Sequence, residues 1–301
     1  MNFNLDFLRF RFIALIASVS FILVSLATIS IQQLQLGLDF TGGTLVEVGF
    51  TETVDPEEIR TYLEGKQIDA LVQAFGSDKD LLIKIPSSEN IENANIVIDS
   101  LQQQYSFQLR RSGFVGPQVG GELRDQGGLG LLAALLVMMI YIMFRFQYKF
   151  AIGAVVALFH DVLIVLGIFS ILRLEFDLSV LAALMAVIGY SLNDTIVVSD
   201  RIRENFRSER ALGSEDLINL SLNQTLSRTV ITSLTTLLVL FALFFFGGDA
   251  VRGFSLGLII GVLIGTYSSL YIVTTILISL NLSQEDMAVP DVEGAEFDDM
   301  P

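Results

Sequence analysis

The sequence contains no cysteine, no tryptophan and a single histidine, His160. Without cysteine, neither a disulfide framework nor a thiolate metal site can form. With one histidine, metal chemistry that needs two imidazoles is excluded within the chain, and we expect neither a metal nor a cofactor. A phosphate-binding loop and a nucleophile elbow are also absent from the sequence. We therefore expect that the chain is not an enzyme and has no hydrolytic or redox chemistry of its own.

Charged residues are scarce as well. They make up 17% of the 301 residues, whereas 52% are hydrophobic, and the mean hydropathy is +0.63. This composition is typical of a polytopic membrane protein surrounded by lipid, and not of a single soluble core. The net charge of −15 argues against a nucleic-acid partner.

Six apolar runs are long enough to cross a hydrocarbon layer of about 30 Å. The first follows Arg9 and Arg11 and, with the N-terminus, occupies residues 1–31. A cleaved signal peptide is the competing interpretation, but the run is too long for a typical one and no small-x-small cleavage site follows it. We therefore expect six transmembrane helices. The other five runs, within residues 128–282, are 129–146, 150–172, 178–199, 228–247 and 254–280.

The distribution of basic residues predicts the orientation in the membrane. With the N-terminus inside, only Arg173 and Arg252 lie in the short outer loops. Because Lys and Arg concentrate on the cytoplasmic side, both termini are predicted to be cytoplasmic. Residues 32–127 then form a periplasmic domain with its linkers, and residues 283–301 an acidic, disordered cytoplasmic tail. The basic residues of the inner segments are Arg9, Arg11, Arg145, Lys149, Arg201, Arg203, Arg207, Arg210 and Arg228.

The outer segment has the pattern of a small α+β domain. Asp55 as N-cap, Pro56 at the first helical position and Glu58 in a capping box mark the start of one helix. The order of elements is β-α-β-β-α-β, as in a ferredoxin-like fold. The Gly- and Pro-rich residues 116–124 are predicted to form a defined turn before the second span. Strands are expected at 44–50, 70–75, 81–85 and 107–115, and helices at 55–66 and 88–105.

Ionisable side chains inside the predicted spans are the candidates for function. Asp194, with Asn193 beside it, lies ~10 Å from the cytoplasmic end of the fourth span, and His160–Asp161 lies ~16 Å into the third. A carboxylate in the bilayer costs about 3 kcal/mol and is rarely present without a task. Arg228 enters the fifth span from the same side as Asp194, so an ion pair between the two is geometrically possible. The Asp194 carboxylate could then alternate between an ion-paired and a protonated state. We predict a proton relay of Asp194, Arg228 and Asp161, with His160 and Asn193 as weaker candidates.

Each candidate also has a structural alternative. Asp194 could hydrogen-bond to a Ser or Thr of a neighbouring helix. The His160–Asp161 pair could be a local cap or could fix helix packing. Arg228 could be an ordinary residue of the positive cytoplasmic side.

The sixth span carries a ladder of small residues. Glycine recurs at every fourth position, which lets another helix approach closely. The sequence does not say which helix packs on this ladder. Its members are Gly253, Gly257, Gly261 and Gly265.

Several short motifs, in order along the chain, carry a resemblance to a known family. They are residues 38–44 (LDFTGGT), 115–123 (VGPQVGGEL), 190–198 (YSLNDTIVV), 200–205 (DRIREN), 226–229 (LSRT), 252–254 (RGF) and 265–269 (GTYSS). Together they resemble the SecF members of the SecD/SecF family over nearly the whole chain except the tail. The motif residues outside the predicted relay are Asp39, Gly42, Gly43, Gly116, Pro117, Gly120, Glu122, Asp200 and Arg201.

The resemblance implies an RND-like bundle, a location and partners. Such proteins form half of a twelve-span unit with SecD in the bacterial inner membrane, beside the SecYEG channel, and YajC is a further candidate partner. Using protons as the coupling ion, the unit helps to complete the export of preproteins on the periplasmic side. In the family, residues matching Asp194 and Arg228 are implicated in proton transport, and SecD supplies another Asp. The candidate Asp161 rests on burial alone.

Two other functions are weighed against this one. A passive scaffold or assembly subunit of a membrane complex is the alternative, with Asp194 as a packing residue. A small-molecule RND exporter is disfavoured, because such exporters carry all twelve spans and larger periplasmic domains on one chain.

Overall fold

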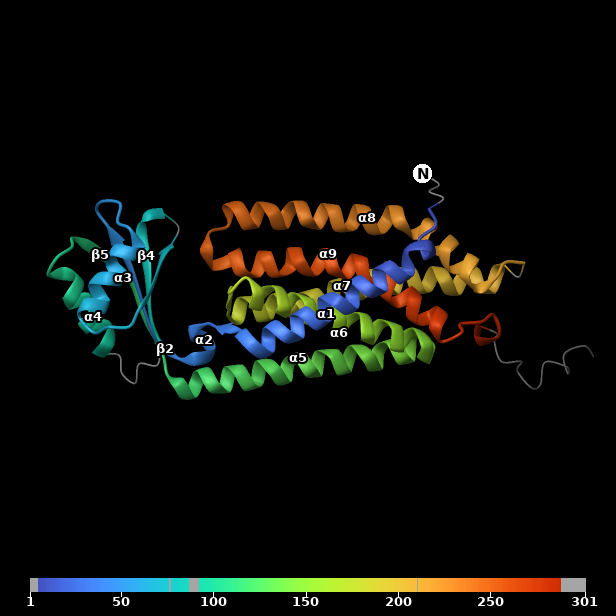
Figure 1. The fold of residues 1–301 in the computed structure, drawn as a ribbon, viewed down its shortest axis with the longest axis horizontal. Helices are drawn as coiled ribbons and strands as arrows, with labels where there is room; N and C mark the ends of the chain where they lie inside the picture. Colours follow the sequence, from blue (N-terminus) through green and yellow to red (C-terminus); the bar gives the residue numbers. More distant parts are fainter. Residues whose placement is uncertain (1–4, 76, 87–91, 210, 288–301) are drawn as a thin grey trace, which may run out of the picture.

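Six long helices lie side by side, and a sheet with two helices sits at one end of them (Figure 1). This arrangement comes from a computed structural model, which describes residues 5–75, 77–86, 92–209 and 211–287. Residues 288–301, most of the predicted acidic tail, and residue 88, the predicted start of a helix, lie outside the described residues. We call the end of the bundle next to the sheet the domain end and the opposite end the far end.

All six long helices have the length and apolarity that crossing a membrane requires. A short turn of 3₁₀-helix, Leu8–Phe10, precedes the first of them. The six are α1 (Arg11–Gln32), α5 (Pro117–Arg145), α6 (Tyr148–Ile171), α7 (Leu178–Ser208), α8 (Ser214–Phe246) and α9 (Asp249–Ser279).

Three of these helices extend well beyond the apolar runs that predicted them. α5 begins at Pro117 with Gly116 as N-cap residue, so the expected turn over residues 116–124 is wrong. Proline at the first helical position starts a helix because its missing N–H is not needed there. α7 continues to Ser208 and α8 starts at Ser214, because polar residues continue a helix outside the membrane as well as apolar ones do.

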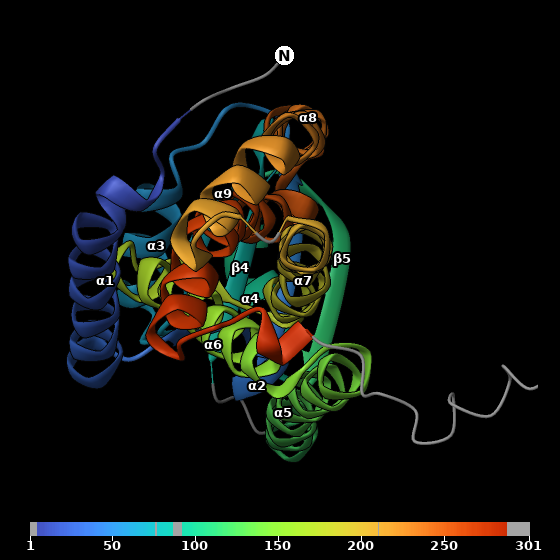
Figure 2. The same cartoon turned by 90° about the vertical axis from the view of Figure 1, so that its right-hand side faces the viewer.

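The centre of the bundle is formed by α6, α7 and α9. More than half of the apolar window of each is buried inside the molecule, whereas α1, α5 and α8 expose most of theirs. Figure 2, which looks along the bundle from the far end, shows α1, α5 and α8 at its periphery. Polar side chains on the inward faces of the central helices are therefore enclosed by protein.

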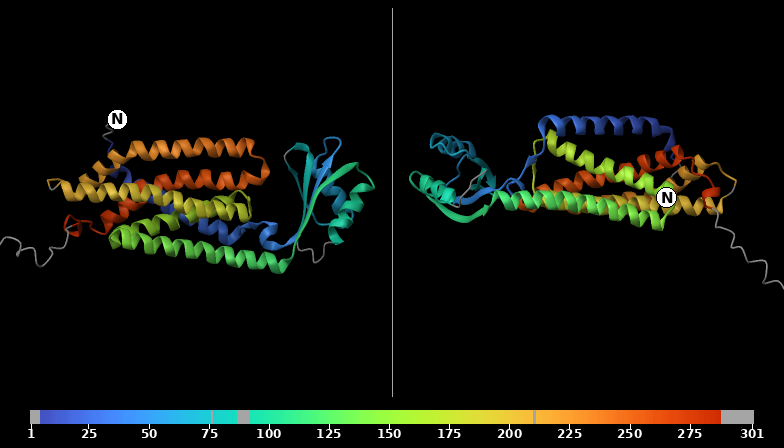
Figure 3. Two further views of the ribbon diagram at one scale, coloured as in Figure 1. Left: turned by 180° about the vertical axis from the view of Figure 1, so that it is seen from behind. Right: turned by 90° about the horizontal axis from the view of Figure 1, so that it is seen from below.

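The α+β domain contains one four-stranded antiparallel sheet in the order β3-β4-β2-β5. This is the split β-α-β arrangement that the order of elements predicts. The helices cover one face of the sheet, on the side away from the bundle (Figure 3), and Ile59, Leu63 and Leu101 from them are fully buried. The elements are β2 (Gly43–Phe50), α3 (Pro56–Gly65), β3 (Leu71–Phe75), β4 (Ser77–Pro86), α4 (Glu92–Gln102) and β5 (Phe107–Val115).

The domain is joined to the bundle by more than its two chain connections. A short helix, α2 (Leu38–Thr41), follows α1, and strand β1 (Gln35–Leu36) pairs in parallel with β6 (Glu175–Phe176) before α7. An ion pair between Lys84 of β4 and Glu175 of β6 links the four-stranded sheet to this β1–β6 pair. These contacts link the sheet to the segment that directly precedes α7.

The first and the last described residues contact the far end of the bundle. The side-chain amides of Asn219 and Asn223 on α8 hydrogen-bond to both the N–H and the C=O of Leu5 and to the N–H of Phe7. After α9, the Lys149 ammonium donates at 2.6 Å to the carboxylate of Asp286, which lies in the short 3₁₀-helix Glu285–Met287.

Candidate functional site

The glycine ladder of α9 packs against α7. A Cβ atom added at Gly261 would lie 2.0 Å from Cγ2 of Val187, and one added at Gly265 would lie 3.0 Å from Cβ of Ser191. Gly253 and Gly257 face Val180 and Ala183 of the same helix. At these glycines the backbone of α9 contacts side chains of α7 directly. The close packing also places the hydroxyl groups of α9 next to α7.

At the end of this ladder, three helices meet on the carboxylate of Asp161. Asp161 lies on α6 and is completely buried. Its Oδ2 accepts hydrogen bonds from Ser191 of α7 at 2.6 Å and from Ser268 of α9 at 2.8 Å. Its Oδ1 lies 2.9 Å from Nδ1 of His160. The close approach of α9 to α7 is what allows both hydroxyls to reach one oxygen.

His160 connects this cluster to the first helix. Its ring stacks on Tyr267 with 6.2 Å between centroids and an angle of 28° between planes. The Tyr267 hydroxyl lies 2.6 Å from the Ala14 carbonyl and 2.9 Å from the Ser18 hydroxyl on α1. The imidazole Nε2 is buried and makes no hydrogen bond within the described part of the chain.

Asp194 lies on α7 one turn closer to the far end than Ser191. The residue is 2% exposed, and its Oδ2 has no hydrogen-bond partner among the residues that the structure describes. The hydroxyls of Ser233 on α8 and Thr266 on α9, which are 2.7 Å apart, and the guanidinium of Arg228 interact favourably with its carboxylate. A second polar site, distinct from the Asp161 cluster, is therefore built around Asp194.

Arg228 is near Asp194 but not in contact with it. Its side chain is exposed at the surface of α8, and no ion pair joins the two groups within the described ranges. One and two turns further along α8, Thr232 and Thr235 lie on the same side of the helix as Arg228, and both threonine hydroxyls bond to their own helix. The next residue, Thr229, is buried instead.

Asn193, a weaker candidate, is not brought to the site. Its side chain is exposed, whereas those of Leu192 and Asp194 on either side are buried. Neighbours on a helix are about 100° apart, so a residue next to a buried one readily faces outward.

The family-motif residues near the domain end interlock. A Cβ added at Gly42, where φ is +71°, would lie 2.7 Å from Cα of Pro117, and one added at Gly120 would lie 2.8 Å from the backbone N of Gly42. Gly43 lies close to the backbone of β4, because a Cβ added at Gly43 would lie 2.4 Å from the carbonyl oxygen of Ile85. The glycines are needed here because two backbones approach without room for a side chain.

Asp39 connects this interlock to α7. Its Oδ2 accepts a hydrogen bond from the N–H of Leu178 at 3.1 Å, and the N-cap residue Asp177 accepts one from Val180 at 2.9 Å. Two carboxylates thus satisfy the first free N–H groups of α7 and oppose its positive N-terminal dipole. Of the remaining motif residues, Gly116 caps α5 and Glu122 is exposed on it.

The motif residues Asp200 and Arg201 lie at the far end, away from both polar sites. Asp200 pairs with Arg145 of α5 at 3.3 Å. Arg201 pairs with Glu204 at 2.6 Å and donates to Gln224 of α8 at 2.6 Å. The pair with Arg145 and the hydrogen bond to Gln224 join α7 to α5 and α8 at the far end of the bundle.

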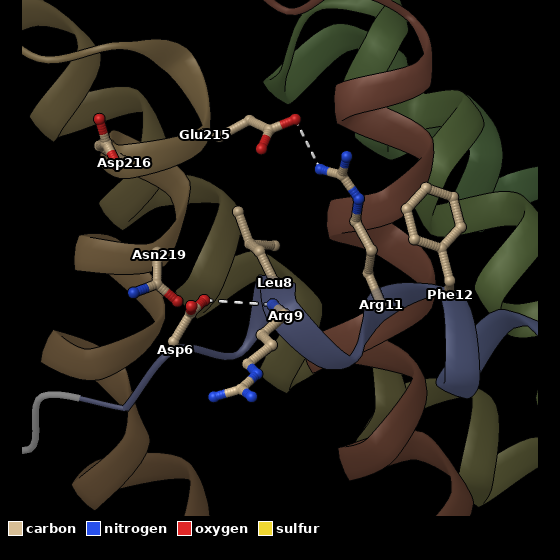
Figure 4. A pocket seen from close by; sticks show the side chains of 8 residues that line it. All are labelled: Asp6, Leu8, Arg9, Arg11, Phe12, Glu215, Asp216 and Asn219. Carbon is tan, nitrogen blue, oxygen red and sulfur yellow. Dashed lines mark hydrogen bonds and ion pairs between the residues drawn. The ribbon is translucent and has the colours of Figure 1, made fainter.

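A pocket of 550 Å³ also lies at the far end, between the start of α1 and α8. Figure 4 shows Arg11 reaching toward Glu215, at 2.5 Å, and the Asp6 carboxylate beside the backbone N–H of Arg9. None of its lining residues belongs to the two polar sites, so we do not assign the proton chemistry to it.

Sequence reasoning gave no role to the hydroxyl residues that complete the two sites, although four of them lie within the family motifs 190–198 and 265–269. Ser and Thr are common in membrane helices and are usually interhelical contacts, so a single one carries little signal. The four consecutive hydroxyl residues within 266–269, in an otherwise apolar span, are a signal that could have found three of them. The missed residues are Ser191, Ser233, Thr266, Tyr267 and Ser268.

Comparison with known proteins decides the family. The family described as "Protein export membrane protein SecD/SecF, C-terminal" matches residues 96–283, and "SecD/SecF GG Motif" matches residues 28–54. The chain is 45% identical to protein translocase subunit SecF of Vibrio alginolyticus, over 99% of this chain and 97% of that one. The chain belongs to the SecF branch of the SecD/SecF family. It is also 46% identical to the Pseudomonas aeruginosa SecF, over 99% of this chain and 98% of that one.

A solved structure of the family has the same fold. The crystal structure of SecDF from Thermus thermophilus, described as a translocon-associated membrane protein, matches with a TM-score of 0.85 at 35% identity. The match covers 93% of this chain, and the chain spans 39% of the length of that SecDF. The super-membrane-facing form of SecDF matches with a TM-score of 0.72. As a SecF family member, the chain is a multi-pass membrane protein and an accessory subunit of Sec protein translocation.

Proposed function

We propose that this subunit, together with SecD, couples the movement of protons to the completion of protein export. In this proposal the α+β domain and the domain end face the periplasm, and both termini and the far end lie on the cytoplasmic side of the bacterial inner membrane. The observation that carries it is Asp194, a buried carboxylate with one oxygen free of any hydrogen bond in the described part of the chain. Such a group is costly in a membrane unless it binds and releases protons.

The surroundings of Asp194 suit a group that changes its protonation state. Ser233 and Thr266 can donate to a carboxylate or accept from a carboxylic acid, because a hydroxyl is both donor and acceptor. Arg228 acts on the charged form across space, without the short ion pair that would lock it. Its side chain is free to approach when Asp194 is ionised and to withdraw when it is neutral.

The α7 helix gives the proton site a mechanical link to the export side. Asp194 lies in its membrane part, and its N-terminus is held by Asp39 and lies beside the Lys84–Glu175 pair to the sheet. A shift of α7 that follows protonation would therefore act directly on the domain, because packed helices move as rigid elements.

The partners follow from the incompleteness of the chain. SecDF of T. thermophilus is one chain of which this protein spans 39%, and we propose that SecD supplies the remainder. The exposed apolar side chains of α1, α5 and α8 provide a surface for SecD and for lipid. The SecYEG channel, with YajC as a further candidate, and exported preproteins are the other proposed partners.

The proposal is tested by replacing Asp194 with Asn, which keeps the size of the side chain but removes its titration. We expect the variant to copurify with SecD at the wild-type level and to lose the proton-gradient-dependent step of export in membrane vesicles. The control is Ser20→Ala, since Ser20 is exposed on α1 and, within the described residues, its hydroxyl bonds to the Ile16 carbonyl of its own helix. Normal export by Asp194→Asn would refute the proposal.

The alternative of a passive assembly subunit predicts another outcome. If Asp194 only packs helices, Asp194→Asn lowers copurification with SecD in proportion to any loss of export. Measuring both quantities on the same membranes separates the two functions.

A further inference from the structure

The His160–Asp161 pair is a second pair of ionisable groups in the bundle, and the action of Asp194 does not use it. The two residues are 2% and 0% exposed, and neither of the groups that interact with Asp194 on α8 contacts them. His160 is the single histidine of the sequence. A pair of this kind in the centre of a membrane bundle is expensive to keep.

We propose that His160, paired with Asp161, is a proton-binding site separate from Asp194, and that its imidazole Nε2 is the atom that gains and loses the proton. The binding of the proton stands on the local geometry alone, whereas its use in export rests on the function proposed above.

Asp161 has hydrogen-bond partners at both of its carboxylate oxygens. Ser191 and Ser268 both donate to Oδ2, and Nδ1 of His160 lies within hydrogen-bond distance of Oδ1. When Nδ1 carries a proton, three donors meet the two oxygens of this carboxylate, an arrangement that suits an acceptor-only anion. Of the described hydrogen-bond partners of this carboxylate, His160 is the one that can carry a positive charge.

Among the described residues, no further ionisable side chain of the neighbouring elements hydrogen-bonds to the Asp161 carboxylate. α1 contributes the Ser18 hydroxyl and the Ala14 carbonyl, both bonded to Tyr267, and α9 contributes Tyr267 and Ser268. α7 contributes Ser191, with Asp194 one turn further along. The imidazolium form of His160 therefore neutralises a carboxylate that would otherwise be an isolated buried anion.

The two nitrogens of His160 then have different tasks. Nδ1–H is fixed by Asp161 and keeps its proton in both states, as the second nitrogen of a carboxylate-bound imidazole does. Nε2 makes no hydrogen bond in the part of the chain that the structure describes. Proton uptake forms the Nε2–H bond with a proton from hydronium, leaving water, and release returns that proton to a water molecule. The pair is neutral overall when loaded and carries one negative charge when released.

The key variant is His160→Asn. The Asn amide nitrogen takes the place of Nδ1 and can still donate to Asp161, but the variant has no group in the place of Nε2. A structural role is therefore retained and proton binding is removed. We expect normal copurification with SecD and at least a tenfold loss of proton-gradient-dependent export, while Asp161→Asn, which removes the charge, also lowers copurification. Wild-type export by His160→Asn at every pH between about 6 and 8 would overturn the role in export.

Proton binding itself is measured by NMR on the complex in lipid nanodiscs, purified without a polyhistidine tag. The ¹⁵N-histidine signals that disappear in His160→Asn belong to His160. We expect Nε2 to change from protonated to bare as the pH rises between about 5 and 9, with Nδ1 protonated throughout. An imidazole that keeps one form over this range would overturn the site.

The same spectra separate the two proposals. In Asp194→Asn, the His160 signals should still titrate although export is lost. If Asp194→Asn exports normally, the proposed function fails, and the titration of His160 still decides whether the proton site exists.

Discussion

The close packing of α9 on α7 makes a sharp prediction for Gly261→Ala. The new Cβ would lie 2.0 Å from Cγ2, 2.8 Å from Cγ1 and 3.0 Å from Cβ of Val187. A rotation of Val187 moves the γ carbons but not its Cβ, so α9 has to move away from α7. Gly261 lies one turn before Gly265 and two turns before Ser268. The same movement therefore lengthens the hydrogen bond from Ser268 to Asp161.

The expected cost comes from two terms. Overpacking of a close-packed interface costs about 1–3 kcal/mol. Each hydrogen bond from Ser191 or Ser268 to the buried Asp161 carboxylate is worth about 1.5–3 kcal/mol, of which a lengthened bond loses a part. We therefore expect Gly261→Ala to lower the free energy of unfolding by about 2–4 kcal/mol.

Gly189→Ala is the matched control. Gly189 lies on α7 itself, and a Cβ there meets no heavy atom of the described chain within 4 Å. Alanine in place of glycine inside a helix stabilises by about 0.5–1 kcal/mol, so this variant should be as stable as the wild type or more so. Adding Val187→Ala to Gly261→Ala removes Cγ1 and Cγ2, the two closest carbons, and leaves the contact of 3.0 Å with Cβ, so it should restore part of the lost stability.

The assay is equilibrium unfolding of the purified complex in mixed micelles, followed by far-UV circular dichroism. The reasoning is refuted if Gly261→Ala is as stable as Gly189→Ala. It is also refuted if Val187→Ala fails to improve Gly261→Ala, because the clash would then not be the cause.

Two further predictions concern the ends of the bundle. Asp39→Ala removes one acceptor from the N-terminus of α7 and should cost about 1 kcal/mol in the same unfolding assay, whereas Asp39→Asn, which keeps an acceptor oxygen, should cost less. At the far end, burial raises the pKa of Asp286, but hydrogen bonds from Lys149 and Ser283 outweigh it, so the pKa lies below its ordinary 3.8. This contact therefore contributes stability above pH 3.8 that is lost as the pH falls through the lowered value. Protection of residues 281–287 from proteolysis should be present at pH 7 and absent in Asp286→Asn; equal protection of both proteins would contradict the contact.

The helices and the α+β domain were predictable because each leaves a local pattern. Apolar runs mark the spans, and strand alternation with the cap at Asp55 marks the split β-α-β order. The first turns of α5, from Pro117 on, were missed because glycine-rich polar sequence has the composition of a turn. No local sequence pattern shows that the helix includes these residues. They pack against Gly42, which follows α2 and is far away in the sequence.

The sequence correctly identified Asp194 and Asp161 as buried acids. An ionisable residue stands out in an apolar span because burying it in a membrane is costly. The partners of Asp161 were not predictable, since Ser191 and Ser268 are 30 and 107 residues away from it. Asn193 was misplaced because proximity in sequence does not fix the face of a helix. The glycine ladder predicted a close contact, but only the three-dimensional arrangement identifies α7 as its partner.

The central claim is that Asp194 carries protons, and proton movement itself is the most direct test. The complex with SecD and SecYEG is reconstituted in vesicles that contain a pH-sensitive dye, and an imposed proton gradient is followed while a preprotein is exported. We expect export-dependent proton movement with the wild type and with Ser20→Ala, and none above background with Asp194→Asn. Proton movement at the wild-type rate in Asp194→Asn would contradict the account.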